Sequence, residues 1–358
     1  MNSIYAVDKI YLMLGSACNL KCRHCYQADN PQPHLKKRIH PDVFAFLARI
    51  AAQRPDPVEL VFWGGEPLLY WNLIREVVDR LGPVFKYGFI SNGTLLTDEM
   101  VDYLNAHDIL FSVSCDGPQT AKVRGVNILE DDAFCARFRR INRRCVGTTV
   151  HAYNIDPEAL QSWLFERVGE VRIHYQYTLE CTWDMDRDLY AYDFEKFEAN
   201  LDRCAEAFAR DFREGRDVTA AAYCFRRGVS AIRKYRSMDA RGKPRYWWPE
   251  CSSMRKTMNI GIDGTVHLCH NRDTPLGRVT DSYEALLEAN DRMLREALSA
   301  KTECDACDVR EWCRRGCPIN SVSANPGQKE CCRAERIYWL ASLKAEKNVK
   351  KLYTRIAL

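Results

Sequence analysis

The chain has 358 residues, of which 46% are hydrophobic and 28% charged, and its formal net charge is +4. This length allows one large domain or two ordinary ones, and the composition allows a sizeable buried core. The charge is too small to indicate a nucleic-acid partner, and no apolar stretch approaches the roughly 20 residues of a membrane span. We therefore expect neither nucleic acid nor a membrane among the partners.

Cysteine is unusually frequent, with 17 residues. An odd number in so long a chain does not suit the disulfide frameworks of small secreted proteins. Export is not indicated either, because the apolar run at 10–14 is shorter than the roughly 7–15 residues that a signal sequence needs. We expect a cytoplasmic protein whose cysteines serve metal or redox chemistry.

The first half of the chain alternates between strand-like and helix-like patterns. Short runs of β-branched, apolar and aromatic residues predict strands at 9–14, 58–63, 85–91, 109–114, 146–151 and 171–178. Amphipathic stretches between them predict helices near 41–52, 70–81, 97–106, 132–144 and 157–168. This alternation predicts an α/β fold in which parallel strands carry helices on the outside, as an open or closed barrel. Six repeats by about residue 185 are too few for a complete eight-fold barrel.

The pattern changes after the sixth repeat. Residues 193–236 have a helical pattern, and Arg241-Gly242-Lys243-Pro244 marks a boundary. Short strands, turns and closely spaced cysteines follow. We expect three parts: a barrel core over 1–190, a helical connector over 191–245, and a small cysteine-rich domain with a C-terminal helix over 246–358.

Three cysteines follow the first predicted strand with the spacing C-x3-C-x2-C: Cys18, Cys22 and Cys25. Three thiolates on one short loop can hold three irons of a [4Fe–4S] cube and leave the fourth iron without a protein ligand. An open iron can bind the amino and carboxylate groups of S-adenosylmethionine (SAM) and pass an electron into its sulfonium, which releases a 5′-deoxyadenosyl radical. The alternative is zinc, but a structural zinc site needs four ligands and no fourth cysteine or acid lies nearby.

Polar or glycine-rich motifs follow the next three predicted strands. They are Gly64-Gly65-Glu66-Pro67, Ser91-Asn92-Gly93 and Ser114-Cys115-Asp116-Gly117-Pro118, with Arg124 a little further along. Each motif alone indicates only a turn. Together they stand at the C-terminal ends of successive parallel strands, so all of them must open on the face where barrel enzymes place their active sites.

On these motifs the sequence resembles the radical SAM superfamily, and specifically its branch with a C-terminal SPASM domain. The resemblance implies a partial (β/α)6 TIM-like barrel followed by the cysteine-rich SPASM domain. It also implies that Cys18, Cys22 and Cys25 bind the SAM-cleaving cluster. The other implied roles concern SAM itself: Gly65 and Glu66 at the amino group, Ser114 and Arg124 at the carboxylate and ribose, and Leu179 beside the adenine.

The later cysteines resemble the SPASM pattern, whose members usually hold two auxiliary [4Fe–4S] clusters. The resemblance assigns Cys251, Cys269 and Cys317 to auxiliary cluster I. It assigns Cys304, Cys307, Cys313 and one of Cys331 and Cys332 to auxiliary cluster II, and we favour Cys332. A zinc ribbon is the alternative, since C-x2-C pairs also serve zinc.

Two departures from the family pattern stand out. Residues 252–257 contain no cysteine, so cluster I either keeps an open iron or borrows Cys331 or a ligand that is not cysteine. His270 stands where sulfatase maturases have an acidic base, which argues against that activity. Among the remaining cysteines, Cys115 and Cys181 lie near predicted strand ends and are candidate donors of a hydrogen atom or proton to a substrate radical.

Members of this branch mainly modify peptides, so the resemblance implies maturation of a ribosomally made peptide. The modification would be a cross-link, thioether, epimerisation or oxidation, with an external one-electron reductant. With 17 residues before Cys18 we expect no N-terminal recognition domain, so a leader peptide would dock on the barrel, on the SPASM edge or on a separate recognition protein. The alternatives are a small-molecule alcohol or sugar dehydrogenase, and a non-catalytic zinc-binding module.

Overall fold

The computed structural model describes residues 7–25, 38–177, 187–241, 254–270, 272–316 and 328–356. Leu179, Cys181, Cys251 and Cys317, to which sequence analysis assigned roles, lie outside the described residues. The chain forms two compact units. The first comprises 1–114, 131–145 and 248–298, and the second comprises 115–130, 146–247 and 299–358. The division into domains at residues 190 and 245 stays a prediction.

The first unit is built on four parallel strands: β1 (Lys9–Gly15), β2 (Val58–Gly64), β3 (Phe85–Ser91) and β4 (Leu110–Ser114). Each pairs with the next along the chain, with Leu12 opposite Phe62 and Phe62 opposite Phe89. These three side chains are buried. Parallel strands are covered on both faces, which explains why these segments are almost continuously apolar.

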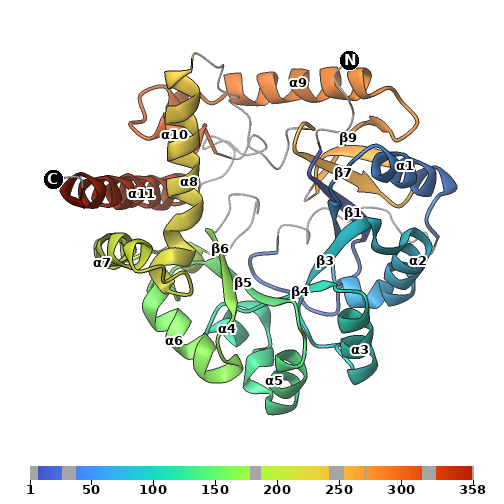
Figure 1. Ribbon diagram of the computed structural model, residues 1–358, viewed down its shortest axis with the longest axis horizontal. Helices are drawn as coiled ribbons and strands as arrows, with labels where there is room; N and C mark the ends of the chain where they lie inside the picture. Colours follow the sequence, from blue (N-terminus) through green and yellow to red (C-terminus); the bar gives the residue numbers. More distant parts are fainter. Residues whose placement is uncertain are drawn as a thin grey trace. The chain divides into compact units, whose positions relative to one another are not determined.

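Helices connect these strands, as the sequence pattern predicted. They are α1 (Pro41–Ala52), η2 (Pro67–Tyr70), α2 (Trp71–Leu81), η3 (Gly82–Val84), α3 (Asp98–Ala106) and α5 (Asp132–Arg139). Polar caps fix where the helices begin: Thr97 accepts a hydrogen bond from the Met100 amide, and Asp131 accepts from the Ala133 and Phe134 amides. The predicted α/β alternation is confirmed, and α1, α2 and α3 lie on the outer side of the strands (Figure 1).

Part of the cysteine-rich segment joins this sheet. Strand β7 (Thr257–Gly261) pairs in parallel with β1, and β8 (Thr265–Cys269) and β9 (Arg272–Arg278) follow in antiparallel order. Helix α9 (Tyr283–Ser299) comes next in the chain. Within the first unit the strand order is therefore β4-β3-β2-β1-β7-β8-β9. Cys269, at the end of β8, thereby belongs to the unit that carries the first three cysteines.

The second unit contains most of β5 (Arg144–Val150), which begins in the first unit, and β6 (Arg172–Tyr177). Its helices are α4 (Thr120–Arg124), η4 (Ile128–Glu130), α6 (Pro157–Val168), η5 (Arg187–Leu189), α7 (Phe194–Arg213), α8 (Ala220–Ala240), η7 (Thr302–Cys304), α10 (Arg310–Cys313) and α11 (Gln328–Ile356).

The segment expected to be helical over 193–236 forms two helices, α7 and α8. Gly215 between them has φ +68°, and Asp211 near the end of α7 accepts hydrogen bonds from Arg216 and Thr219. Helix α11 packs closely on α8 at Gly228, where a Cβ atom would lie 2.5 Å from Ser342 Oγ. A larger residue at this crossing would have to displace Ser342 and Tyr338.

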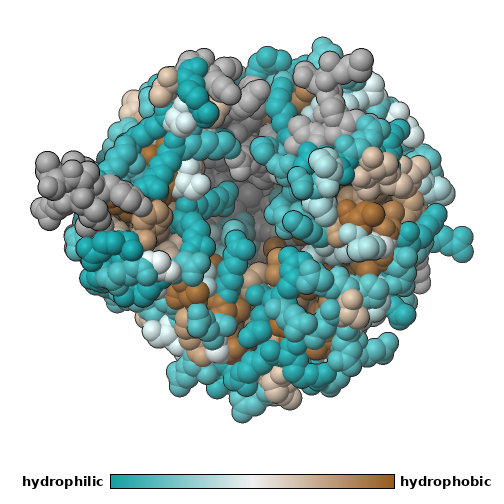
Figure 2. Space-filling view, in the orientation of Figure 1, coloured by the Kyte–Doolittle hydropathy of each residue, from teal (hydrophilic) through white to brown (hydrophobic). Residues whose placement is uncertain are grey.

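Hydrophilic side chains cover most of the face drawn in Figure 2, with smaller apolar areas between them. Over the part of the chain that the structure describes, every helix is too short or too polar to cross a membrane.

Candidate active site

The cysteine loop in the first unit begins where β1 ends, and the end of β2 holds it in place. The Gly65 amide donates a hydrogen bond to Gly15 O and the Glu66 amide donates to Ala17 O, each at 2.9 Å. Tyr70 adds a third contact, since its hydroxyl accepts a hydrogen bond from the Ala17 amide at 2.9 Å. The backbone just before Cys18 is therefore anchored to the Gly-Gly-Glu turn.

Gly65 allows this approach because it has no side chain. A Cβ atom at this position would lie 2.2 Å from Ala17 O and 2.5 Å from Ser16 O. Real side chains do not tolerate such distances, so any other residue would push the cysteine loop away from the end of β2.

Glu66 ties the ends of β2 and β3 together. Its side chain is buried, with 1% of the residue exposed. Oε1 accepts hydrogen bonds from the Leu68 amide at 2.9 Å and the Ser91 hydroxyl at 2.7 Å, and Oε2 accepts from the Asn92 amide at 2.7 Å. Burial raises the pKa of Glu66, although the three hydrogen bonds favour the carboxylate. Because both oxygens accept hydrogen bonds, this carboxylate holds the loop after β2 and the loop after β3 together.

A ring of three side chains links the β3 loop to the cysteine loop. Asn92 Nδ2 donates to Asn19 Oδ1 at 2.8 Å, Asn19 Nδ2 donates to Thr94 Oγ1 at 2.8 Å, and the Thr94 hydroxyl donates to Asn92 Oδ1 at 2.7 Å. These three residues had no predicted role. Asn19 lies inside the C-x3-C spacing and Asn92 inside the Ser-Asn-Gly motif, but no spacing rule pairs positions 73 residues apart.

The cysteine loop has the features that a cluster site requires. Cys18 is exposed, Cys22 and Cys25 are half-buried, and the Cys25 amide closes a turn onto Cys22 O at 3.1 Å. Partial burial raises the pKa of the Cys18 thiol, and the charges of Glu66 and Cys25 act in the same direction, whereas the Leu20 amide donates a hydrogen bond to its sulfur at 3.4 Å. His24 is 7% exposed and so faces the protein.

Within the described ranges, no three His, Cys, Asp or Glu side chains converge as ligands of a single metal ion would. Zinc needs such convergence, because its four ligands bind one ion. A [4Fe–4S] cube does not need it, since each thiolate binds a different iron. Three thiolates on one loop suit such a cube, because they can bind three of its irons and leave the fourth without a protein ligand.

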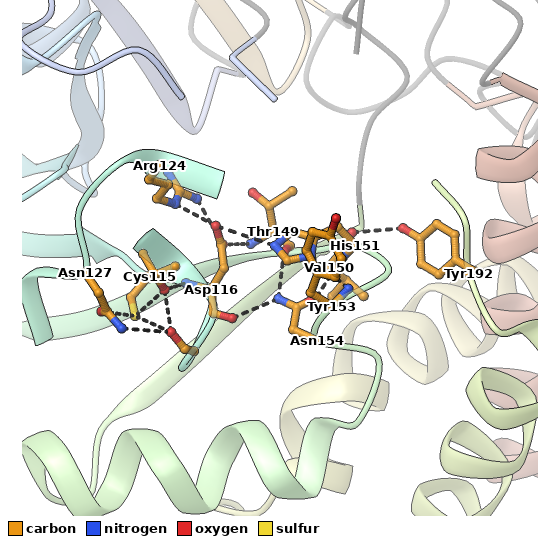
Figure 3. Close-up of polar contacts among 12 residues, drawn as sticks. Cys115, Asp116, Arg124, Asn127, Thr149, Val150, His151, Tyr153, Asn154 and Tyr192 are labelled. Carbon is orange, nitrogen blue, oxygen red and sulfur yellow. Dashed lines mark hydrogen bonds and ion pairs between the residues drawn. The ribbon is translucent and has the colours of Figure 1, made fainter. Parts of the chain in front are cut away.

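The second unit carries a buried ion pair directly after β4. Arg124 Nε and Nη2 lie 2.7 and 3.0 Å from Asp116 Oδ2 and Oδ1 (Figure 3). The Asp116 side chain has 0% and the Arg124 side chain 12% of its surface exposed. This bidentate geometry fixes the plane of the guanidinium. Ser114, the last residue of β4, is half-buried and belongs to the first unit.

Strand β5 and the turn after it complete the surroundings of Asp116. The Thr149 amide donates to Oδ1 at 2.8 Å, and Asn154 Nδ2 donates to the Asp116 backbone oxygen at 3.2 Å (Figure 3). His151 Nε2 lies 3.9 Å from Oδ2, and His151 Nδ1 accepts a hydrogen bond from the Tyr153 amide at 3.2 Å. Asp116 therefore organises both Arg124 and the end of β5.

Cys115 is enclosed within the same loop. It is 0% exposed, and its sulfur lies 3.2 Å from Thr120 Oγ1 and 3.7 Å from Asn127 Oδ1 (Figure 3). Burial raises the pKa of this thiol to about 12. The thiol is therefore protonated at neutral pH and held by its neighbours.

The later cysteines of the second unit lie on tight turns and at the start of α11. Cys304, Cys307 and Cys313 are half-buried, and the Cys307 amide donates to Cys304 O at 3.2 Å. Cys332 is exposed and interacts electrostatically with Cys304, whose pKa is raised mainly by burial. Cys331 is 2% exposed and belongs to an apolar cluster with Val123, Leu189 and Tyr190.

His270 has an aromatic setting in the first unit. Its ring stacks on Tyr11 with centroids 4.1 Å apart, and Trp63 meets it edge-on at 4.6 Å. Asn259 Oδ1 lies 3.2 Å from His270 Nδ1. Burial lowers the pKa of His270 to about 3, so the imidazole is neutral at physiological pH.

Comparison with known proteins defines the class. Residues 12–160 match the family model described as the radical SAM superfamily, so the chain contains a radical SAM domain. The matched range begins in β1 and includes the cysteine loop, the Gly-Gly-Glu turn and the Asp116–Arg124 pair. The α/β fold and the strand-end motifs agree with this class.

Particular relatives extend the comparison. The chain is 22% identical over 352 residues to the serine-type anaerobic sulfatase-maturating enzyme of Klebsiella aerogenes, covering 89% of this chain and 81% of that protein. It is 25% identical over 130 residues to the radical SAM cyclopropyl synthase TigE of Paramaledivibacter caminithermalis, covering 31% of this chain but only 28% of TigE.

A solved structure, anSMEcpe with bound AdoMet, superposes with a TM-score of 0.68 at 18% identity and covers 96% of this chain and 100% of that one. The same protein has also been solved with AdoMet and the Cp18Cys peptide. At this level of identity the likeness establishes a shared fold, and the predicted α/β fold class is confirmed.

Proposed function

We propose that this protein is a radical SAM enzyme whose cluster is held by Cys18, Cys22 and Cys25. The observation that carries the proposal is the position of these cysteines, on a loop anchored by backbone hydrogen bonds to the Gly65-Glu66 turn. When bound, a [4Fe–4S] cluster and SAM supply reductive cleavage of the sulfonium and a 5′-deoxyadenosyl radical that removes a hydrogen atom from the substrate.

The surrounding residues would bind and orient SAM. Gly65 lets the backbone of its turn approach the cysteine loop closely, and we propose that this turn meets the SAM amino group. Glu66 supports that turn from beneath, because its oxygens already accept three hydrogen bonds from the protein. Ser114 and Arg124 are proposed to bind the carboxylate and ribose, with Arg124 oriented by Asp116. Leu179 remains the proposed neighbour of the adenine.

The later cysteines are proposed to hold two auxiliary clusters. Cys304, Cys307, Cys313 and Cys332 form one ligand set, and the choice of Cys332 is supported by its exposure and by the burial of Cys331 among apolar side chains. Cys251, Cys269 and Cys317 form the other set. Clusters that bridge distant segments would also contribute folding free energy to a loop-rich region.

We propose a ribosomally made peptide as the substrate. The support is the kind of protein that this chain resembles: a sulfatase-maturating enzyme and a solved relative that binds a peptide. An external one-electron reductant is required, and a leader peptide or a separate recognition protein would deliver the substrate. Because His270 replaces the acidic base, we do not extend sulfatase maturation itself to this chain. The enclosed thiol of Cys115 suits a structural role better than hydrogen donation, which leaves Cys181 as the candidate donor.

Anaerobic reconstitution tests the proposal. The protein should bind roughly 8–12 irons per chain and produce 5′-deoxyadenosine from SAM under dithionite. The Cys22→Ala variant should lose this product, while Cys135→Ala, a buried cysteine outside the ligand sets, should retain it. A colourless protein that binds zinc, or an unchanged rate in Cys22→Ala, would contradict radical chemistry.

The substrate is tested separately. Co-expression with short peptides encoded beside the gene should give a defined mass change that depends on Cys22. A mass change only in small alcohols or sugars would identify the dehydrogenase alternative instead.

A further inference from the structure

Three polar side chains near Cys18 form a closed hydrogen-bond ring that the radical chemistry does not by itself require. In this ring Asn92 donates to Asn19, Asn19 donates to Thr94, and Thr94 donates back to Asn92, at 2.7 to 2.8 Å. Each side-chain amide accepts with its oxygen and donates with its nitrogen. The orientation of each side chain in the ring is therefore fixed by its hydrogen bonds to the other two side chains. The Thr94 amide adds a further bond to Asn92 Oδ1 at 3.0 Å.

One side of the ring is rigidly supported. The Asn92 backbone amide donates to the buried carboxylate of Glu66 at 2.7 Å, and Ser91 beside it donates to the same carboxylate. Ser91 Oγ also accepts a hydrogen bond from the Gly93 amide at 2.9 Å. Asn92 is thus held by the buried Glu66 carboxylate, which joins the ends of β2 and β3.

The other side of the ring is the cysteine loop. Asn19 directly follows Cys18, and its side chain lies at the exposed rim of the loop. The anchors on Gly15 and Ala17 hold the loop only before Cys18. The ring is a side-chain anchor located after Cys18, so it restrains the segment between the first and second cysteines.

The geometry points to Asn19, Asn92 and Thr94 as positioning residues that hold the cysteine loop in the conformation in which it would present a bound cluster to SAM. This inference rests on the proposed function. SAM would bind both to the cluster held by the cysteine loop and to the Gly65 turn, so a loop displaced by about 1 Å would weaken binding even with all three thiolates in place. Substituting residues that orient metal ligands without binding the metal themselves typically lowers metal affinity or activity by about 10- to 100-fold.

Thr94→Val is the sharpest variant, because it keeps the side-chain shape and removes two of the three ring bonds without touching Glu66 or a cysteine. Asn19→Ala removes the same anchor from the loop side. The matched control is Thr97→Val, the same chemical change three residues away, where the hydroxyl caps α3 instead.

The first measurement is the affinity of the reconstituted, reduced protein for SAM. Binding is monitored through the change that SAM causes in the electron paramagnetic resonance spectrum of the cluster. Thr94→Val and Asn19→Ala should retain the iron content of the parent and bind SAM about tenfold or more weakly. Their double variant should be no weaker than either single variant, since both break one ring. Affinities within twofold of the parent, additive losses, or an equal loss in Thr97→Val would overturn the inference.

The second measurement does not depend on the cluster. Hydrogen–deuterium exchange of the metal-free chain reports local opening. Peptides covering 16–25 should exchange faster in Thr94→Val than in the parent and in Thr97→Val. Unchanged exchange would overturn the positioning role. A parent protein that fails to bind SAM would instead contradict the proposed function and leave the exchange result standing.

Discussion

Cys331 and Cys332 are adjacent in the chain but occupy opposite environments. Cys331 is 2% exposed and packs with Val123, Leu189 and Tyr190. Cys332 is exposed and interacts electrostatically with Cys304. Consecutive residues of a helix point about 100° apart, so α11 can present only one of the two to a cluster that lies on one side.

This relationship predicts different consequences for the two cysteines. Cys332→Ala should lose the iron of one cluster, about four irons per chain. Cys331→Ala should retain iron and instead lower the free energy of unfolding by about 1 kcal/mol, because it removes a small buried side chain. Iron analysis and urea unfolding of the reconstituted proteins measure both effects. Loss of iron in Cys331→Ala alone would reverse the assignment.

Removing the charge of Asp116 should destabilise the second unit. In Asp116→Asn, Arg124 would keep a largely buried charge without its counter-ion, which costs about 3 kcal/mol. The comparison is Glu158→Gln, whose partner Arg203 is half exposed and whose loss should cost less than about 1 kcal/mol. Urea unfolding measures both. Equal, small losses would show that the Asp116 pair contributes no more than a surface pair.

Gly65→Ala should separate the cysteine loop from the end of β2. The added methyl group would lie 2.2 Å from Ala17 O, so the backbone must shift, at a cost of about 1–3 kcal/mol. We expect 5′-deoxyadenosine formation to fall at least about tenfold, as 1 Å displacements in active sites do.

The control for this variant is Gly82→Ala. Gly82 has φ +65° and open space around it, so alanine there strains the backbone without contacting the cysteine loop. Its ψ of −157° makes this a conformation that is essentially restricted to glycine, so the variant should lower stability by about 1–3 kcal/mol and leave the rate unchanged. If both variants lost activity equally, the loss would reflect general destabilisation.

Cys115 should contribute to the pH dependence of stability. Burial raises the pKa of its thiol to about 12 in the folded state, from an ordinary value of 9.0. The folded state therefore holds its proton where the unfolded state releases it, so this contribution is complete below pH 9 and declines as the pH rises from about 9 to about 12. Cys115→Ala should flatten the decline in unfolding free energy over this interval. An unchanged slope would show that the thiol is not protected in the folded protein.

Cys115→Ala also tests catalysis. With a buried thiol bound to Thr120 and Asn127, we expect both SAM cleavage and product formation to continue at near the parent rate. Loss of product with SAM cleavage intact would instead assign Cys115 as the hydrogen donor, and mass spectrometry of the substrate distinguishes the two results.

Local features of the sequence were sufficient to predict the order of strands and helices in the barrel. β1 to β4 are apolar runs that both faces of a parallel sheet bury, and caps such as Thr97 and Asp131 mark helix starts within a few residues. The cysteine spacing also needs no tertiary information, because all three ligands lie on one loop. Apolar runs, helix caps and cysteine spacing each involve residues that are close together in the chain, so they can be recognised from the sequence alone.

Only the tertiary structure showed which contacts join segments that are far apart in the chain. The pairing of β7 with β1 and the ring of Asn19, Asn92 and Thr94 depend on side chains and strands that meet only after folding. The same holds for Cys331 and Cys332, since packing against residues far away in the chain determines which of them turns inward. Hydrogen bonds and buried contacts between remote residues leave no periodic trace in the sequence, so only the three-dimensional arrangement reveals them.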